Sequence, residues 1–315
     1  MEEANHTCWV QFFFRPFSMD SNAQVLIFVA FLVMYLLSLT GNGAIGLTIW
    51  TNYSLYTPMY FFLANLAILE IFYTTAIAPL AMTALLTMGR TPVPLASCGT
   101  QMFFFVFLGG ADCILLAVMA YDRFVAICHP LHYRLIMSWR LCIQLTIGAL
   151  VLGFLLSLTL TSLIFQLPFR GNIEINHFYC DMPAVMRLAH ADTRVHETAL
   201  HIVSFIILAI PATLIFISYV SVGMAISQIR SVEGRHRALS TCSSHITVVL
   251  LQYGCTSFIY LSPSDNFSPE MGQGMSVVYT FITPVLNPVI YSMRNKLLKD
   301  ALKKTLRRCL LPQRK

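Results

Sequence analysis

The chain has 315 residues, of which 57% are apolar and only 11% are charged, whereas soluble domains carry about a quarter charged residues. This composition excludes an ordinary soluble protein, because too little polar surface is available to keep a chain of this length dispersed. The formal net charge of +6 matches the anionic lipid of an inner membrane leaflet, so we expect membrane lipid, and no nucleic acid, as a partner.

Seven apolar blocks predict seven membrane-spanning helices. Residues 24–50, 141–167 and 198–227 contain no Asp, Glu, Lys or Arg, and each block exceeds the roughly 20 residues that a helix needs to cross a bilayer. The predicted fold class is an all-α membrane protein, a seven-transmembrane helix bundle over residues 24–295 with a short amphipathic C-terminal helix. The four other blocks are nearly as apolar and lie near 58–86, 99–121, 238–261 and 271–293.

The basic residues predict the orientation of the bundle. With the N-terminus outside, 15 of the 20 Lys and Arg residues fall in inner segments. Because an excess of Lys and Arg marks the cytosolic side, we expect a multi-pass plasma-membrane protein with residues 1–23 extracellular. The acidic start of the chain argues against a cleavable signal peptide, and the sequon at Asn5 predicts a glycosylation site.

Residues 296–315 form a predicted cytosolic helix and tail. Leu298, Ala301, Leu302 and Leu306 share one face of a helix whose other face is basic, which is typical of a helix lying on the inner leaflet. Cys309 at its end is either a palmitoylation site or an unmodified cytosolic thiol.

Two acids, Glu70 and Asp112, fall well inside the second and third predicted spans. Ionisable side chains at such depth are costly and indicate function, although each could be a neutral or snorkelling acid. We expect the two carboxyls to meet across the bundle and either to share a proton or to hold a small cation such as sodium. Apart from that ion, no cofactor and no metal is expected.

The third predicted span carries its distinctive residues on one face. Its members follow alternating steps of three and four, so they form a stripe that should face the bundle axis; they are Cys98, Met102, Phe105, Gly109, Asp112, Leu116, Met119 and Arg123. Cys98, on the same stripe, and Cys180, in the long loop near 168–196, both fall on the outer side, where cysteines can be oxidised. A bond between them would hold this loop as a lid over the bundle.

The last predicted span contains a weak point. Pro284 and Pro288 flank Asn287. Prolines kink membrane helices and free backbone carbonyls, and the amide of Asn287 can bind such a loosened backbone. We expect the helix to bend here during switching.

Five short motifs occur in order along the chain: Thr57–Tyr60, Met119–Cys128, Ser218–Tyr219, Ser240–His245 and Pro284–Asn295. In this order and spacing they resemble the signatures of the odorant receptors, a family of rhodopsin-like G-protein-coupled receptors. Because the motifs span nearly the whole chain in register, the resemblance is far more specific than a lone Asp-Arg pair would be.

The resemblance implies a receptor that binds small volatile molecules and activates the olfactory stimulatory G protein, a heterotrimer, to raise cyclic AMP. It also implies that Arg123, held by Asp122 in the inactive state, swings free to meet the G protein beside Tyr219 and Tyr291. Glu70 and Asp112 match the family's acidic pair around an ion site.

The resemblance further matches Cys98 and Cys180 to the main disulfide of the family. Two departures accompany it. Phe124 replaces the usual tyrosine after the arginine, and Arg170 and His190 stand where the family has two further loop cysteines. Because both cysteines are missing together, the lid should have one covalent link fewer.

A ligand cavity is expected in the outer half of the bundle, between the third, fifth, sixth and seventh spans. The residues at matching depth are apolar with a few hydroxyls and carry no fixed charge, which suits a small neutral molecule with one hydrogen-bonding group. For each residue, ordinary helix packing is the alternative. The expected lining is Phe105, Val106, Gly109, Val203, Ser204, Ile207, Tyr253, Thr256, Tyr260 and Thr280.

Other classes of membrane protein fit less well. A retinal-binding light receptor needs a lysine within the membrane, but all lysines lie from Lys296 onward. A transporter or channel would need a continuous polar path, and beyond Glu70 and Asp112 the spans offer little. An enzyme is not expected, because no set of nucleophile, base and orienting group is evident.

Overall fold

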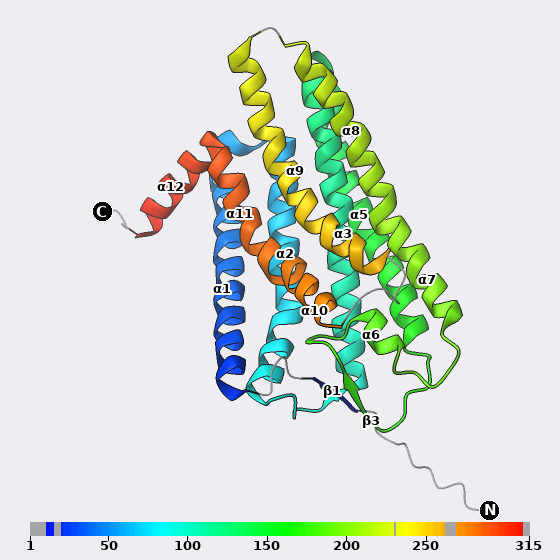
Figure 1. Cartoon of the computed structure of the whole chain (residues 1–315). Coiled ribbons are helices and arrows are strands. Elements are labelled where there is room, and N and C mark those ends of the chain that lie inside the picture. Colours follow the sequence, from blue (N-terminus) through cyan, green and yellow to red (C-terminus); the bar gives the residue numbers. More distant parts are fainter. Residues whose placement is uncertain (1–10, 16–19, 230, 262–268, 311–315) are drawn as a thin grey trace, which may run out of the picture.

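The computed structural model of the chain describes residues 11–15, 20–229, 231–261 and 269–310. These residues form a bundle of long helices, with a small sheet at one end and helix α12 at the opposite end (Figure 1). We refer to these as the sheet end and the α12 end. The long helical segments are α1 (Ser21–Thr51), α2 (Pro58–Leu86), α3 (Leu95–Cys128), α5 (Trp139–Ile164), α7–η3–α8 (Arg194–Ser204, Phe205–Ala209, Ile210–Ser227), α9 (Val232–Tyr260) and α10–η5–α11 (Pro269–Val277, Val278–Ile282, Thr283–Arg294).

Six of these segments are long and apolar enough to cross a membrane, and α9 completes the seven-helix bundle that the seven apolar blocks predict. Helix α9 has 29 residues but is less apolar, because its first turns contain exposed charged residues such as Glu233 and Arg235. Further along, its polar side chains His245, Gln252 and Thr256 are buried inside the bundle, where hydrogen bonds can satisfy such groups. The chain is a multi-pass membrane protein of the predicted fold class.

Helix starts follow local sequence signals. Asp20 precedes α1, and its carboxylate accepts hydrogen bonds from the backbone N–H groups of Asn22 at 3.3 Å and Ala23 at 3.2 Å, as an N-cap does. Pro58 occupies the first turn of α2, where its missing N–H costs nothing. Ser138 caps α5 in the same way as Asp20, through the N–H of Leu141.

Two segments are π-helical, and each ends two residues before a proline. Segment η3 (Phe205–Ala209) precedes Pro211, and η5 (Val278–Ile282) precedes Pro284. A proline lacks the N–H that the regular helical ladder requires, and π segments of this kind recur at functional sites. Because a π segment rotates the following residues relative to a regular helix, it changes which side chains face the bundle axis.

The sheet links the N-terminal segment to the long loop after α5. Strand β1 (Gln11–Phe14) pairs in parallel with β3 (Asn172–Ile175) and antiparallel with β2 (Val93–Pro94). No strand was expected in the N-terminal segment. The predicted glycosylation site, Asn5, lies outside the described residues.

The long loop is also held by the disulfide between Cys98, near the start of α3, and Cys180, with 5.5 Å between their Cα atoms. Directly after Cys180 the short helix α6 (Met182–Met186) begins, and Met182, Val185 and Met186 are buried. The loop therefore covers the sheet end of the bundle as the sequence predicts.

The expected amphipathic helix is α12 (Lys296–Leu310). Leu298 and Ala301 on its apolar face are buried, whereas Leu306 is exposed. Asn52, at the end of α1, donates a hydrogen bond to Thr305 at 3.2 Å. The helix is thus joined to the bundle by its first turns and by a polar contact to α1. The side chain of Cys309 lies outside the described part of the chain.

Candidate functional site: a cavity toward the sheet end, a central polar cluster and a pocket toward the α12 end

A small cavity lies between α3, η3 and α9, toward the sheet end. Its volume is about 60 Å³, which leaves room for a few water-sized groups at about 10–15 Å³ each. Eleven of its sixteen lining residues lie on helices α3, α7 and α9. The lining residues are Tyr73, Phe105, Val106, Gly109, Gly110, Cys113, Leu160, Met182, Leu200, Val203, Ser204, Ile207, Leu208, Gln252, Thr256 and Tyr260.

Eight of the ten residues expected at the ligand cavity line it, and Tyr253 and Thr280 do not. The hydroxyl of Tyr253 instead donates to the backbone carbonyl of Cys113 at 2.6 Å. Thr280 is fully buried, and its hydroxyl donates to the carbonyl of Ser276 at 2.6 Å. Thr280 lies within η5, where the π-helical geometry departs from the regular period on which the expectation rested.

Gln252 and Cys113 line the cavity without having been singled out from the sequence. A signal for Gln252 was available, because Gln252, Thr256 and Tyr260 follow in steps of four and therefore share one face of α9. Residues Met182 and Leu200 come from the loop and from α7, and no periodicity in the spans could have indicated Met182.

A buried network of polar side chains closes the cavity on the sheet side. Asp181 in the loop accepts hydrogen bonds from Tyr260 at 2.6 Å and from Tyr179 at 3.3 Å. The hydroxyls of Tyr179 and Tyr279 are 2.6 Å apart, and Ser276 lies 3.0 Å from Tyr279. The loop is thereby joined to both α9 and η5 through side chains.

The electrostatics of this network follow from burial. Desolvation raises the pKa of Asp181 to about 6, although hydrogen bonds from Tyr260 and Tyr179 lower it in part. Desolvation also lowers the pKa of His177 to about 3, so this imidazole is neutral; its Nε2 lies 3.2 Å from the hydroxyl of Ser276. The network therefore contains one carboxylate held mainly by phenol groups.

The two acids in the middle of the bundle are both buried, with Glu70 3% and Asp112 6% exposed. They are close enough to interact electrostatically. Glu70 accepts hydrogen bonds from the amides of Asn287 and Asn42, the latter at 3.4 Å. Asp112 Oδ1 has no hydrogen-bond partner among the described residues. Such a cluster of oxygen atoms with one unused carboxylate oxygen has the chemistry to hold a small cation.

Asn42 was not singled out from the sequence, although it is a polar residue in an otherwise apolar block. Its amide donates to the carbonyl of Pro284 at 3.0 Å. That carbonyl has no helical donor, because Pro288 four residues later lacks an N–H. Asn42 therefore connects α1, α2 and α11 at the kink in the last helix.

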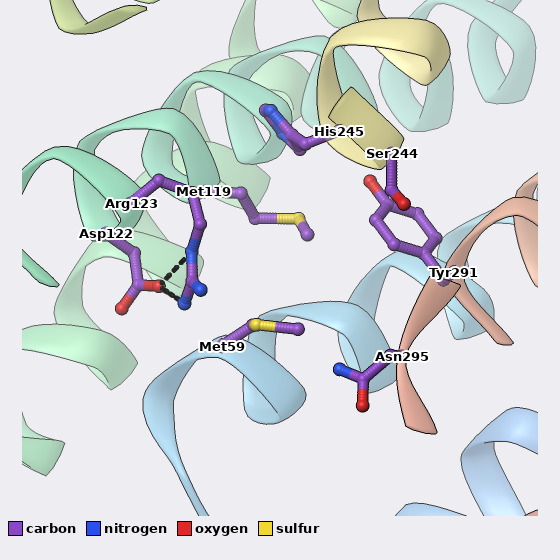
Figure 2. Close-up of a pocket in the computed structure, with 8 residues that line it drawn as sticks. All are labelled: Met59, Met119, Asp122, Arg123, Ser244, His245, Tyr291 and Asn295. Atoms are coloured by element: carbon purple, nitrogen blue, oxygen red, sulfur yellow. Dashed lines mark hydrogen bonds and ion pairs between the residues drawn. The ribbon is translucent and has the colours of Figure 1, made fainter. Parts of the chain in front are cut away.

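A second pocket, of about 30 Å³, is lined by residues near the end of α3 and the end of α11 (Figure 2). Figure 2 shows Arg123 turned toward Asp122, with hydrogen bonds between them, and Tyr291 beside Ser244. Asp122 also accepts a hydrogen bond from Tyr133 at 2.7 Å. The pocket is lined by Met59, Met119, Asp122, Arg123, Ser244, His245, Tyr291 and Asn295.

Three side chains beside this pocket, Tyr219, His245 and Tyr291, either form a hydrogen bond between helices or have a polar atom without a hydrogen-bond partner among the described residues. Tyr219 on α8 and His245 on α9 are joined by a hydrogen bond of 2.7 Å. His245 Nε2 and the hydroxyl of Tyr291 are buried without a hydrogen-bond partner among the described residues. Three of the residues expected at the switch, Arg123, Asp122 and Tyr291, thus line one pocket. Tyr219 is hydrogen-bonded to His245, which lines the same pocket. Asn287 and Pro288 lie deeper, beside Glu70 and α1.

The comparisons with known proteins agree with this arrangement. A family model described as olfactory receptor matches residues 31–309. Human olfactory receptor 10V1 is 71% identical over 98% of this chain and 100% of its own length, and human olfactory receptor 10Q1 is 55% identical over 93% and 92%. The crystal structure of squid rhodopsin has the same fold, with a TM-score of 0.67 over 95% of this chain and 89% of its own, at 17% identity.

Proposed function

This chain belongs to the olfactory receptor family of rhodopsin-like G-protein-coupled receptors, and we propose that it binds small, mostly neutral volatile molecules at the outer cavity. We propose that it activates an olfactory stimulatory G protein, which raises cyclic AMP. Like its relatives, the chain is a receptor and not an enzyme. In this proposal it lies in the plasma membrane with the sheet end extracellular and the α12 end cytosolic.

The observation that carries the proposal is the position of two pockets at opposite ends of α3. The outer cavity is lined by Phe105 and Gly109, and no Asp, Glu, Lys or Arg is among its lining residues. The other pocket contains Arg123, which is hydrogen-bonded to Asp122. An apolar cavity with a few polar groups is typical of a site for a small neutral molecule. A paired arginine at the opposite end can change partners when the helices move.

Between the two pockets we propose a sodium site formed by Glu70 and Asp112. Two observations support it. Asp112 Oδ1 has no hydrogen-bond partner among the described residues, and the carboxylate of Glu70 accepts hydrogen bonds from side-chain amides. A cation there would favour the helix arrangement in which the two carboxylates are closest. Its release or retention would then bias the position of Asn287 and the kink beside it.

The test is a cyclic AMP reporter in cells that express the chain at the surface, exposed to a broad panel of volatile compounds. A concentration-dependent rise that requires the receptor supports the proposal. Arg123→Ala is the matched control, because it should abolish the response while leaving surface expression largely intact. Full signalling by Arg123→Ala would contradict the coupling role of this residue. A verified surface protein that never changes cyclic AMP would contradict the assignment of the stimulatory G protein.

A further inference from the structure

We propose that the outer cavity selects ligands that carry a hydroxyl group: small uncharged alcohols or phenols that donate a hydrogen bond to Thr256 and accept one from Ser204. The inference rests on the proposed function, because it names the ligand class of the same cavity. It goes beyond that function by distinguishing alcohols from the ketones, aldehydes and ethers that are equally small, neutral and volatile.

Ser204 supplies the first observation. It lines the cavity from α7 and is only 6% exposed. Its hydroxyl makes no hydrogen bond to any residue that the structure describes. Buried hydroxyls are nearly always hydrogen-bonded, and serine in a helix commonly bonds to a carbonyl one turn back. A buried serine without such a bond, facing an otherwise apolar cavity, has its donor and its acceptor available to a ligand.

Thr256 supplies the second observation, because its hydroxyl, unlike that of Ser204, already donates a hydrogen bond to the protein. It lies on α9 and donates its proton to the carbonyl of Gln252 at 2.6 Å. The hydroxyl has one proton, so toward the cavity Thr256 Oγ1 can only accept. Tyr260, one turn further along α9, similarly donates to Asp181 at 2.6 Å. The α9 side of the cavity therefore offers hydrogen-bond acceptors, because the protons of both hydroxyls are already bound to protein oxygens.

The remaining polar groups do not reverse this preference. Gln252 also lines the cavity, and its amide N–H groups can donate to a carbonyl and to a hydroxyl equally well. The phenol of Tyr73 on α2 also lines the cavity and makes no hydrogen bond to a described residue, but a phenol that donates can serve a carbonyl and a hydroxyl equally well. Amines and carboxylates are disfavoured, because an unpaired charge in a mostly apolar cavity is strongly destabilised.

The ligand classes therefore differ in the number of bonds that they can form. A ligand hydroxyl can accept from Ser204 and donate to Thr256, whereas a carbonyl or ether oxygen can only accept. For compounds with the same carbon skeleton, we expect the alcohol to bind about tenfold more tightly than the ketone, which is the usual effect of one hydrogen bond. Since the cavity has only about 60 Å³, the compounds should be compact.

The experiment uses the purified full-length receptor in lipid nanodiscs and needs no G protein. The ligand-dependent rise in Tm is measured against concentration for cyclohexanol, cyclohexanone and methoxycyclohexane, and each apparent Kd is calculated from it. In the parent receptor cyclohexanol should bind about tenfold more tightly than the other two. Thr256→Val, which keeps the shape but removes the acceptor, should weaken cyclohexanol alone and abolish the preference. Ser204→Ala should weaken the binding of all three compounds together, because each of them accepts a hydrogen bond from Ser204.

The matched control is Thr213→Val on α8. Thr213 donates to the carbonyl of Ala209 at 2.8 Å, as Thr256 does to Gln252, but its side chain is exposed on the outside of the bundle; the preference should be unchanged. Equal or tighter binding of cyclohexanone or methoxycyclohexane by the parent would overturn the hydroxyl inference alone. If none of the three compounds binds, and neither phenol nor anisole binds, the proposed cavity is overturned as well.

Discussion

Asp181 is the buried carboxylate on which the polar network over the outer cavity depends. It is 5% exposed and receives hydrogen bonds from Tyr260 and Tyr179. Desolvation raises its pKa from 3.8 to about 6. In the unfolded chain the pKa returns to its ordinary value, so folding favours the protonated acid. The stability that this group contributes is fully present below about pH 4 and is lost as the pH rises through about 6.

We predict that Asp181→Asn removes this pH dependence. A pKa change from 3.8 to about 6 corresponds to about 3 kcal/mol in the free energy of unfolding. The Tm of the purified parent receptor should therefore fall between about pH 4 and pH 7 by more than that of Asp181→Asn. Glu174→Gln, a change at an exposed carboxylate of the same loop, is the control and should follow the parent. Parallel curves for the parent and Asp181→Asn would contradict the prediction.

At the scale of elements, α1 and α11 approach each other closely at a glycine. A Cβ atom at Gly41 would lie 3.0 Å from Pro288 Cγ and 3.2 Å from Pro288 Cβ, which is tighter than ordinary van der Waals contact. Because the proline ring is rigid, it cannot move aside as a flexible side chain would. This contact brings Asn42 to the free carbonyl of Pro284, so the glycine positions the hydrogen bond at the kink.

Gly41→Val should therefore destabilise the receptor by about 1–3 kcal/mol, the usual cost of overpacking a well-packed interior. The control is Gly46→Val on the same helix, where nothing lies within 4 Å of the added Cβ. It makes the same chemical change and should lower neither the Tm nor surface expression. If the two variants behave alike, the close packing of α1 on α11 at Gly41 is not what limits stability.

The long loop that forms the lid has two positions, 170 and 190, at which an added disulfide can be tested. The sequence resemblance implies that Arg170 and His190 stand where odorant receptors have two further loop cysteines. The N–H of His190 donates to the carbonyl of Pro168 at 3.3 Å, so the two chain segments are adjacent. Restoring both cysteines should form a disulfide, and closing a loop of this length should stabilise the receptor by about 3 kcal/mol.

The measurement compares the Tm of the double variant Arg170→Cys, His190→Cys with and without a reducing agent, and each single variant is a control. Neither single variant should gain stability under oxidising conditions. A double variant that stays reduced would show that the side chains at these positions do not meet, despite the backbone hydrogen bond between their segments.

At the scale of the whole molecule, most of the fold could be predicted from long-range composition. Charge-free blocks indicate the spans directly, since few soluble structures tolerate them. The strands β1, β2 and β3 could not be predicted, because they depend on contacts between the N-terminal segment and a distant loop. Tyr253 and Thr280 were expected at the cavity but do not line it, for a local reason. Thr280 lies in the π segment Val278–Ile282, which a regular helical period does not predict. Tyr253 donates a hydrogen bond to the carbonyl of Cys113, and the sequence does not indicate which carbonyl a hydroxyl will contact.

The central cluster connects the two ends of the molecule, and its test is the response to sodium. If Glu70 and Asp112 share a cation, Glu70→Gln or Asp112→Asn should each leave a folded receptor, because removing one carboxylate relieves repulsion in a low-dielectric interior. Each should change basal cyclic AMP and weaken its dependence on sodium. The double variant should resemble the singles, since either change already removes the site. Replacing sodium with a bulky organic cation during the assay provides the measurement. A response to sodium that is the same in the parent and in all three variants would show that the two acids are not a shared ion site.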